Sequence, residues 1–78
     1  MEKNHSQKYL LIGKAIQEER KLKGLSQMEL AEKIGVSKSY LSKIEAPNYN
    51  KSFSLEILFD IAAALEINVV NLFKYLKN

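Results

Sequence analysis

The sequence predicts an all-α fold of five helices, and three observations support this prediction. Apolar residues recur at helical spacing, and no stretch alternates as a half-buried strand would. Gly24, Gly35 and Pro47 divide the chain at close intervals. A short pattern typical of helix starts occurs four times. We expect helices at about residues 9–23, 26–34, 37–46, 54–66 and 68–77.

The first expected helix, at about 9–23, has an apolar stripe on one side. Ile12, Ala15 and Ile16 lie near this stripe, and Gly24 fits a left-handed helix terminator. The polar residues 1–8 before it are expected to form a flexible leader, and residues 9–78 a single domain.

Each later helix is expected to begin at a capping residue. The pattern is an apolar residue, a Ser or Asn, three further residues and a Leu. It occurs as Leu25-Ser26…Leu30, Val36-Ser37…Leu41, Phe53-Ser54…Leu58 and Ile67-Asn68…Leu72. The cap oxygen accepts a hydrogen bond from a free N–H group, and the apolar pair fixes the entry of the chain.

The second and third helices are separated only by Gly35 and Val36. Because glycine adopts positive φ without strain, such a connection makes the two helices cross steeply. The outer face of the third helix is polar, short or basic, with Lys38, Ser39, Ser42 and Lys43. A short helix with such a face, held on a rigid corner, has the shape that enters a DNA major groove.

Composition excludes several classes of function. The 78 residues contain no Cys and one His, His5, so disulfides, thiolate sites and sites built on several histidines are impossible. The adjacent Glu18 and Glu19 point about 100° apart on a helix and cannot converge as an acid–base pair, which argues against a small hydrolase. A core of this size seldom supplies more than about 3–5 kcal/mol, so a partner subunit is the remaining source of stability.

Charge and hydropathy indicate a cytoplasmic protein with an anionic partner. The net charge is +3, residues 14–51 alone carry +3, and residues 52–78 carry −1. This asymmetry suits a polyanion binder, although a solvated surface with a chance imbalance is the alternative. The longest apolar run, Ile61–Leu65, is far too short to span a membrane, and no signal peptide is evident.

At Gly24–Glu45 the sequence, GLSQMELAEKIGVSKSYLSKIE, resembles the helix-turn-helix of the phage repressor (Cro/cI, xenobiotic-response-element) family. The chain is also similar in size to restriction–modification controller proteins. The resemblance implies a five-helix lambda-repressor-like domain with a helix-turn-helix at about residues 26–46. It further implies a transcriptional regulator, a repressor or controller, that binds double-stranded DNA and is not an enzyme. No cofactor or metal is expected.

The resemblance also assigns roles in DNA binding. The base contacts it implies are Ser37, Lys38, Ser39, Tyr40 and Lys43. For Tyr40 the alternative is packing on its own helix, and Ser37 is first of all a helix cap.

Further contacts are implied around this helix. The phosphate contacts are Arg20, Gln27, Ser42, Asn48, Lys51 and Ser52. Gln27 also braces a recognition side chain in the family, and Arg20 and Glu45 occupy positions that form an ion pair in several relatives.

The last helix, at 68–78, is expected to make a two-fold dimer contact. It carries more apolar surface than one face can bury, and small relatives dimerise in this region. The residues implied are Val69, Phe73, Tyr75 and Leu76. A homodimer would present two recognition helices to a palindromic operator.

Two other interpretations concern protein partners. The same fold can serve as a protein-interaction module, such as an anti-repressor or antitoxin, with weak or no DNA binding; Lys38 and Lys43 argue against this. Glu29 and Glu32 lie near the site where some activators of the family contact RNA polymerase. Only Glu32 aligns well, and a solvated acidic face is the alternative.

Overall fold

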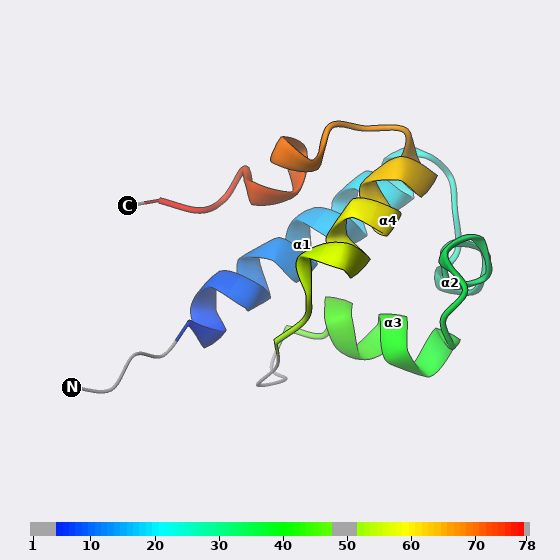
Figure 1. The fold of residues 1–78 in the computed structure, drawn as a ribbon, viewed down its shortest axis with the longest axis horizontal. Coiled ribbons are helices and arrows are strands. Elements are labelled where there is room, and N and C mark those ends of the chain that lie inside the picture. The colour runs from blue at the N-terminus through cyan, green and yellow to red at the C-terminus, as the bar shows by residue number, and fades with distance from the viewer. Residues whose placement is uncertain (1–4, 48–51, 78) are drawn as a thin grey trace.

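The computed structural model describes residues 5–47 and 52–77. These residues form four α-helices and a short 3₁₀ helix, and no strand occurs among them (Figure 1). The elements are α1 (Ser6–Leu22), α2 (Gln27–Ile34), α3 (Lys38–Glu45), α4 (Leu55–Leu65) and η1 (Val69–Phe73). The predicted all-α class is confirmed.

The predicted count of five α-helices is not confirmed, because the last element is a 3₁₀ helix of five residues. The Asn68 side chain accepts from the Val70 N–H at 2.9 Å, and the Asn71 N–H bonds to the Asn68 carbonyl at 2.9 Å. A tight local start of this kind favours i→i+3 bonding over an α-helix. At the other end of the chain, α1 begins at Ser6, earlier than expected, and residues 6–8 of the predicted leader are helical.

The predicted helix starts agree with the structure. The side chains of Ser26, Ser37, Ser54 and Asn68 each accept a backbone N–H of the element that follows. At Ser26 the predicted capping box is complete, because the Glu29 carboxylate also accepts the Ser26 N–H at 2.8 Å. The cap pattern is a local signal, and the local structure follows it.

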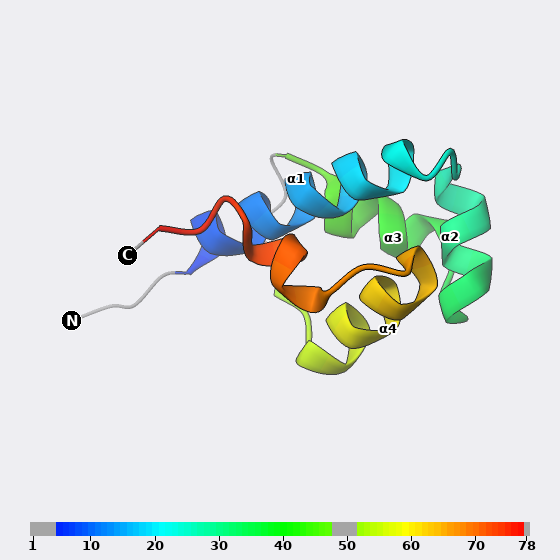
Figure 2. The ribbon, with the colours of Figure 1, turned by 90° about the horizontal axis from the view of Figure 1, so that it is seen from above.

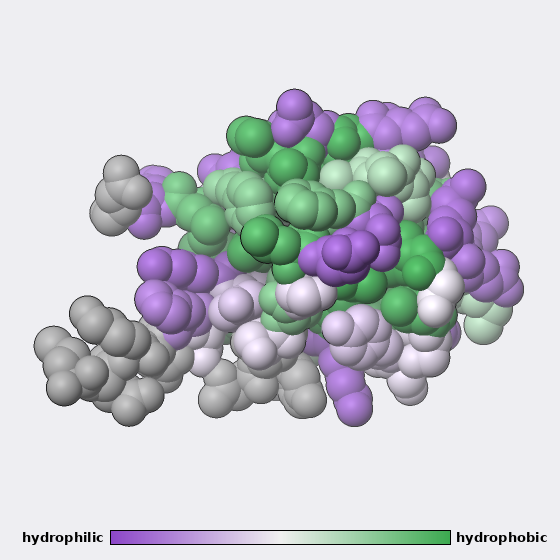
Figure 3. Space-filling view, in the orientation of Figure 1, coloured by the Kyte–Doolittle hydropathy of each residue, from purple (hydrophilic) through white to green (hydrophobic). Residues whose placement is uncertain are grey.

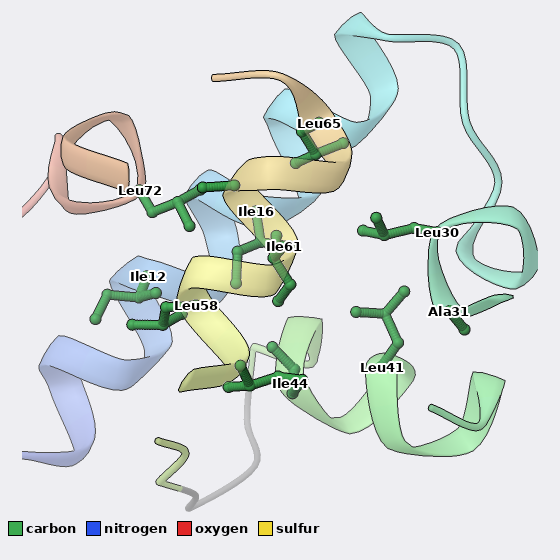
Figure 4. Packing of buried hydrophobic residues seen from close by; sticks show 12 residues of the cluster. Ile12, Ile16, Leu30, Ala31, Leu41, Ile44, Leu58, Ile61, Leu65 and Leu72 are labelled. Atoms are coloured by element: carbon green, nitrogen blue, oxygen red, sulfur yellow. The ribbon is translucent and has the colours of Figure 1, made fainter. Parts of the chain in front are cut away.

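The helices enclose one core. In Figure 1, α1 and α4 cross the middle of the view, with α3 on one side of them and η1 on the other. Seen from above, α1 and α4 lie on opposite sides of the molecule (Figure 2). η1 packs on both α1 and α4, while α2 packs on α3 and α4. Ile16, Leu41 and Ile61 have no exposed surface and belong to one core cluster, which Leu72 joins from η1 (Figure 4). None of the described helices is long and apolar enough to cross a membrane.

A close backbone approach joins α1 to α3. A Cβ atom placed on Gly13 would lie 2.3 Å from the carbonyl oxygen of Ile44, at the end of α3. Only glycine allows the two helices to approach this closely. Gly13 therefore fixes the depth at which α3 sits against α1.

We expect the substitution Gly13→Ala to lower the free energy of unfolding by about 1–3 kcal/mol, since the backbone must move to admit the methyl group. Urea denaturation at fixed protein concentration measures the loss. Gly24→Ala is the matched control: Gly24 has φ +72° but no neighbour within 4 Å of an added Cβ, so only backbone strain of about 1 kcal/mol applies. Equal stability of Gly13→Ala and wild type would contradict the close approach.

Candidate nucleic-acid interface

The turn between α2 and α3 is built from backbone hydrogen bonds. Gly35 has a left-handed φ of 75° and terminates α2. Its N–H bonds to the Glu32 carbonyl at 3.3 Å, and the Val36 N–H bonds to the Ala31 carbonyl at 3.0 Å. Ser37 then caps α3 by accepting the Tyr40 N–H at 3.0 Å. Because Gly35, Val36 and Ser37 each make a hydrogen bond to a neighbouring helix, α3 has a fixed direction relative to α2.

The two faces of α3 differ as predicted. Leu41 and Ile44 are buried in the core, whereas the opposite face is open to solvent. The exposed residues are Lys38, Ser39, Tyr40, Ser42 and Lys43. Tyr40 retains 40% of its surface, so its ring is not buried among the neighbouring side chains of the helix.

A buried ion pair fixes the far end of α3. The Arg20 Nε donates to Glu45 Oε2 at 2.8 Å, and Nη2 donates to Oε1 at 3.0 Å. The two side chains retain 7% and 1% of their surface. The remaining Arg20 nitrogen, Nη1, donates to the Leu25 carbonyl at 2.6 Å, which ties the start of α2 to the same guanidinium. The predicted Arg20–Glu45 pair is thus present, with the two-pronged geometry that arginine favours.

Gln27 joins this network from α2. Its Nε2 donates to Glu45 Oε1 at 3.0 Å. The side chain to which the family resemblance assigns a bracing role therefore bonds to the end of α3 rather than to a base-reading residue. Arg20 is buried and each of its three nitrogens donates within the protein. Two of its five N–H donors, one on Nη1 and one on Nη2, are not used by these bonds. The predicted phosphate contact of Arg20 would have to use one of them, and it stays a prediction.

The loop after α3 is only partly described. Asn48 and Lys51 lie outside the described residues, and Ser52 is exposed.

The residues predicted for a dimer contact lie in two places. Val69, Phe73 and Leu76 are half-buried and pack against the edge of the core. Tyr75 instead turns towards α1, where its hydroxyl donates to Glu18 Oε1. Apolar residues cover much of the surface over η1 and α4, whereas the surface over α3 is more polar (Figure 3).

Beside this apolar surface lies a groove of about 230 Å³ between the first turns of α1, the start of α4 and the C-terminal segment. Sequence reasoning missed the groove because it forms only where these three segments meet. The residues that line it are His5, Lys8, Tyr9, Ile12, Phe53, Leu55, Leu58, Phe73 and Leu76. Among the described residues no group of acidic or histidine side chains could hold a metal ion.

Comparison with known proteins agrees with this geometry. A family model described as "Helix-turn-helix" matches residues 16–72. The chain belongs to this helix-turn-helix family. The resemblance seen in the sequence is confirmed, and so is its non-enzymatic class, because the relatives are transcriptional regulators and a phage repressor.

Among curated relatives, the helix-turn-helix transcriptional regulator SinR of Bacillus subtilis is 48% identical over 59 residues, which cover 76% of this chain and 52% of SinR. The immunity repressor of Bacillus phage phi105 is 43% identical over 60 residues, covering 77% of this chain and 40% of the repressor. The chain thus spans about half the length or less of these relatives.

Solved structures show the same fold. The restriction–modification controller protein C.AhdI of Aeromonas hydrophila superposes with a TM-score of 0.82 at 32% identity, covering 91% of this chain and all of C.AhdI. SinR, described as a master regulator for biofilm formation and solved in complex with DNA, superposes with a TM-score of 0.71 at 48% identity. That match covers 78% of this chain and 95% of the SinR chain.

The buried network gives a stability prediction. Glu45→Ala should lower the free energy of unfolding by about 3–5 kcal/mol, because it leaves the buried Arg20 charge unpaired. The double substitution Arg20→Met with Glu45→Leu should recover most of this loss, since no lone charge remains. Urea denaturation measures both values.

Lys74→Ala is the control, because it removes an ion pair with Glu19 in which the Lys74 side chain is one-third exposed, and it should cost far less. A loss for Glu45→Ala no larger than for Lys74→Ala would show that Arg20 and Glu45 are not held as a buried pair.

Proposed function

We propose that the chain is a sequence-specific DNA-binding transcriptional regulator that acts as a homodimer on a palindromic operator and reads bases with α3. The observation that carries the proposal is the exposed, basic and hydrogen-bonding face of a short helix whose two ends are fixed by the turn at Gly35 and by the Arg20–Glu45 pair. A helix held in this way can enter a major groove without first being ordered. The similar SinR chain was solved in complex with DNA, which supports DNA binding by this fold.

The proposed base contacts lie on that face. Lys38 and Lys43 can each donate to O6 and N7 of guanine, and Ser39 can bond to donor or acceptor edges. The exposed Tyr40 ring is available to a thymine methyl group or the sugar–phosphate chain. The Ser37 oxygen accepts the Tyr40 N–H as the cap of α3, and its hydroxyl proton remains available to donate to DNA.

The proposed phosphate contacts surround α3. Gln27 is half-buried at the start of α2, and one N–H of its amide can donate to a phosphate while the other stays on Glu45. Ser42 and Ser52 are exposed. Asn48 and Lys51 complete the set from the sequence alone. Contacts of this kind orient the protein on DNA and carry no sequence information.

The proposed dimer contact uses the apolar side of the C-terminal segment and the neighbouring groove. Phe73 and Leu76 line the groove, and Val69 is half-buried beside the exposed Val70. A two-fold axis through this region relates two copies of α3, as a palindromic site requires. Glu32, exposed on α2, is the candidate for a contact with RNA polymerase.

Selection of bound fragments from random duplex DNA tests the proposal. We expect enrichment of an inverted repeat whose half-sites lie about 34–36 Å apart, because a symmetric dimer presents α3 once per helical turn. Enrichment of a single half-site would contradict the dimer. The absence of any enrichment at low salt would contradict DNA recognition and favour the protein-interaction module.

The role of Lys43 can be tested on the selected operator. Lys43→Ala should weaken binding by about 1–3 kcal/mol and relax discrimination at one base position, because the contact is to a base edge. Binding to the operator and to its single-base variants measures both effects. Lys23→Ala, an equal charge change at the end of α1, should alter binding little. An equal loss on every sequence would show that Lys43 contacts a phosphate instead.

A further inference from the structure

A cluster of charged and polar side chains joins the C-terminal segment to the outer face of α1. The Tyr75 hydroxyl donates to Glu18 Oε1. The Lys74 ammonium lies 2.9 Å from Glu19 Oε2 and 3.5 Å from Glu18 Oε1. We call Glu18, Glu19, Lys74 and Tyr75 the C-terminal clamp. The two glutamates lie more than fifty residues before Lys74 and Tyr75 in sequence, so the clamp exists only in the folded chain.

A cation on α1 adds to the clamp. The Lys14 ammonium lies 4.8 Å from the centre of the Tyr75 ring, within the range of a cation–π contact. The hydrogen bond from Tyr75 holds the pKa of Glu18 below its ordinary value, and the same bond raises the pKa of Tyr75. At neutral pH the carboxylate is therefore charged, the hydroxyl keeps its proton, and the bond between them is charge-assisted.

The clamp is not needed to bury the end of the chain. Leu72 has no exposed surface and already anchors η1 in the core. The Lys74 side chain and the Glu18 side chain remain 34% and 39% exposed, and ion pairs with such exposure contribute little to stability. What the clamp does fix is the orientation of the chain after η1, because Tyr75 and Lys74 lie between Phe73 and Leu76.

Phe73 and Leu76 are the C-terminal wall of the apolar groove. The other walls are Tyr9 and Ile12 of α1, together with Phe53 and Leu55, which lead into α4. The rings of Tyr9 and Phe53 pack edge to face with their centres 5.0 Å apart. This contact joins the wall from α1 to the wall that precedes α4. The C-terminal wall is held by η1 on one side and by the clamp on the other.

Resting on the homodimer of the proposed function, we propose that the C-terminal clamp positions Phe73 and Leu76 so that the groove receives a second copy of this chain. Tyr75 is then a positioning residue that acts from the α1 side and does not contact the partner. The strength of self-association depends on the clamp, although none of the clamp residues lines the groove.

The charges at the groove favour a second copy as the occupant. Lys8 lines the groove from α1, and the exposed Glu56 follows Leu55 at the start of α4. In the proposed dimer the two-fold axis runs along the groove, which brings Lys8 of one copy to the α4 side of the other, and each contact is then made twice. The exposed Leu55, with 59% of its surface open, gains burial in the same contact.

The test compares dimer dissociation constants, measured by sedimentation equilibrium without DNA, for wild type, Tyr75→Phe, Glu18→Ala and the double variant. Tyr75→Phe keeps the ring and removes only the hydroxyl, so we expect the dissociation constant to rise about two- to tenfold. Because the two residues share one hydrogen bond, the dissociation constant of the double variant should be little higher than that of the single variant with the larger effect. High salt should narrow the difference between wild type and Glu18→Ala.

A control variant and a second measurement distinguish positioning of the C-terminal wall from a change in folding or in surface charge. Asp60→Ala removes an exposed carboxylate elsewhere on the surface and should leave the dissociation constant unchanged. Amide hydrogen exchange of wild type and Tyr75→Phe at Phe73 and Leu76 reports the order of the C-terminal wall, and we expect faster exchange in the variant while the core amides of α4 are unaffected.

The outcomes distinguish this inference from the function on which it rests. A wild-type dimer with an unchanged constant in both Tyr75→Phe and Glu18→Ala would overturn the role of the clamp and leave the dimeric regulator intact. A wild-type chain that stays monomeric at every concentration would overturn the dimer, and the clamp inference with it. If the losses of dimerisation free energy in the two single variants add fully in the double variant, the two residues do not act through a shared bond.

Discussion

The Arg20–Glu45 ion pair is the interaction on which the geometry of the molecule depends. It joins the end of α1 to the end of α3, and through the Leu25 carbonyl and Gln27 it also reaches both sides of the start of α2. Each polar atom of the pair has a partner, and no buried side-chain polar atom among the described residues lacks one. A charge taken out of water is tolerated only on that condition. One carboxylate, that of Glu45, therefore links side chains of three helices.

The apolar core sets distances that the ion pair alone does not. Gly13 lets the backbone of α1 approach Ile44, and Leu41 and Ile44 fill the space between α3 and the two central helices. The polar network fixes the direction of α3, while close packing fixes its depth. The proposed role of α3 in reading bases needs both, because hydrogen bonds to base edges form over only a few ångströms.

The sequence predicted those features whose causes are local. The cap residues Ser26, Ser37 and Ser54, and the glycine at position 35, determine backbone geometry within a few residues, and each behaves as expected. The Arg20–Glu45 pair was predicted only through family resemblance, since the two residues lie far apart in sequence. The C-terminal segment was harder to predict: its apolar pattern suits an α-helix, but the Asn68 side chain and contacts with α1 and α4 favour a 3₁₀ helix. The bonds of Tyr75 to Glu18 and of Gln27 to Glu45 have no local signal.

The division of α3 into a buried and an open face also bears on how such proteins diversify. Leu41, Ile44 and Glu45 carry the packing and the ion pair, while Lys38 and Ser39 are exposed and stand apart from both. Substitutions at these open positions change the chemistry offered to a base pair without creating a cavity or stranding a charge. In the proposed base-reading role of α3, stability and sequence preference are encoded by different residues of one eight-residue helix. On the proposed function, a lineage carrying this domain acquires new operators by point substitution while its fold remains the same.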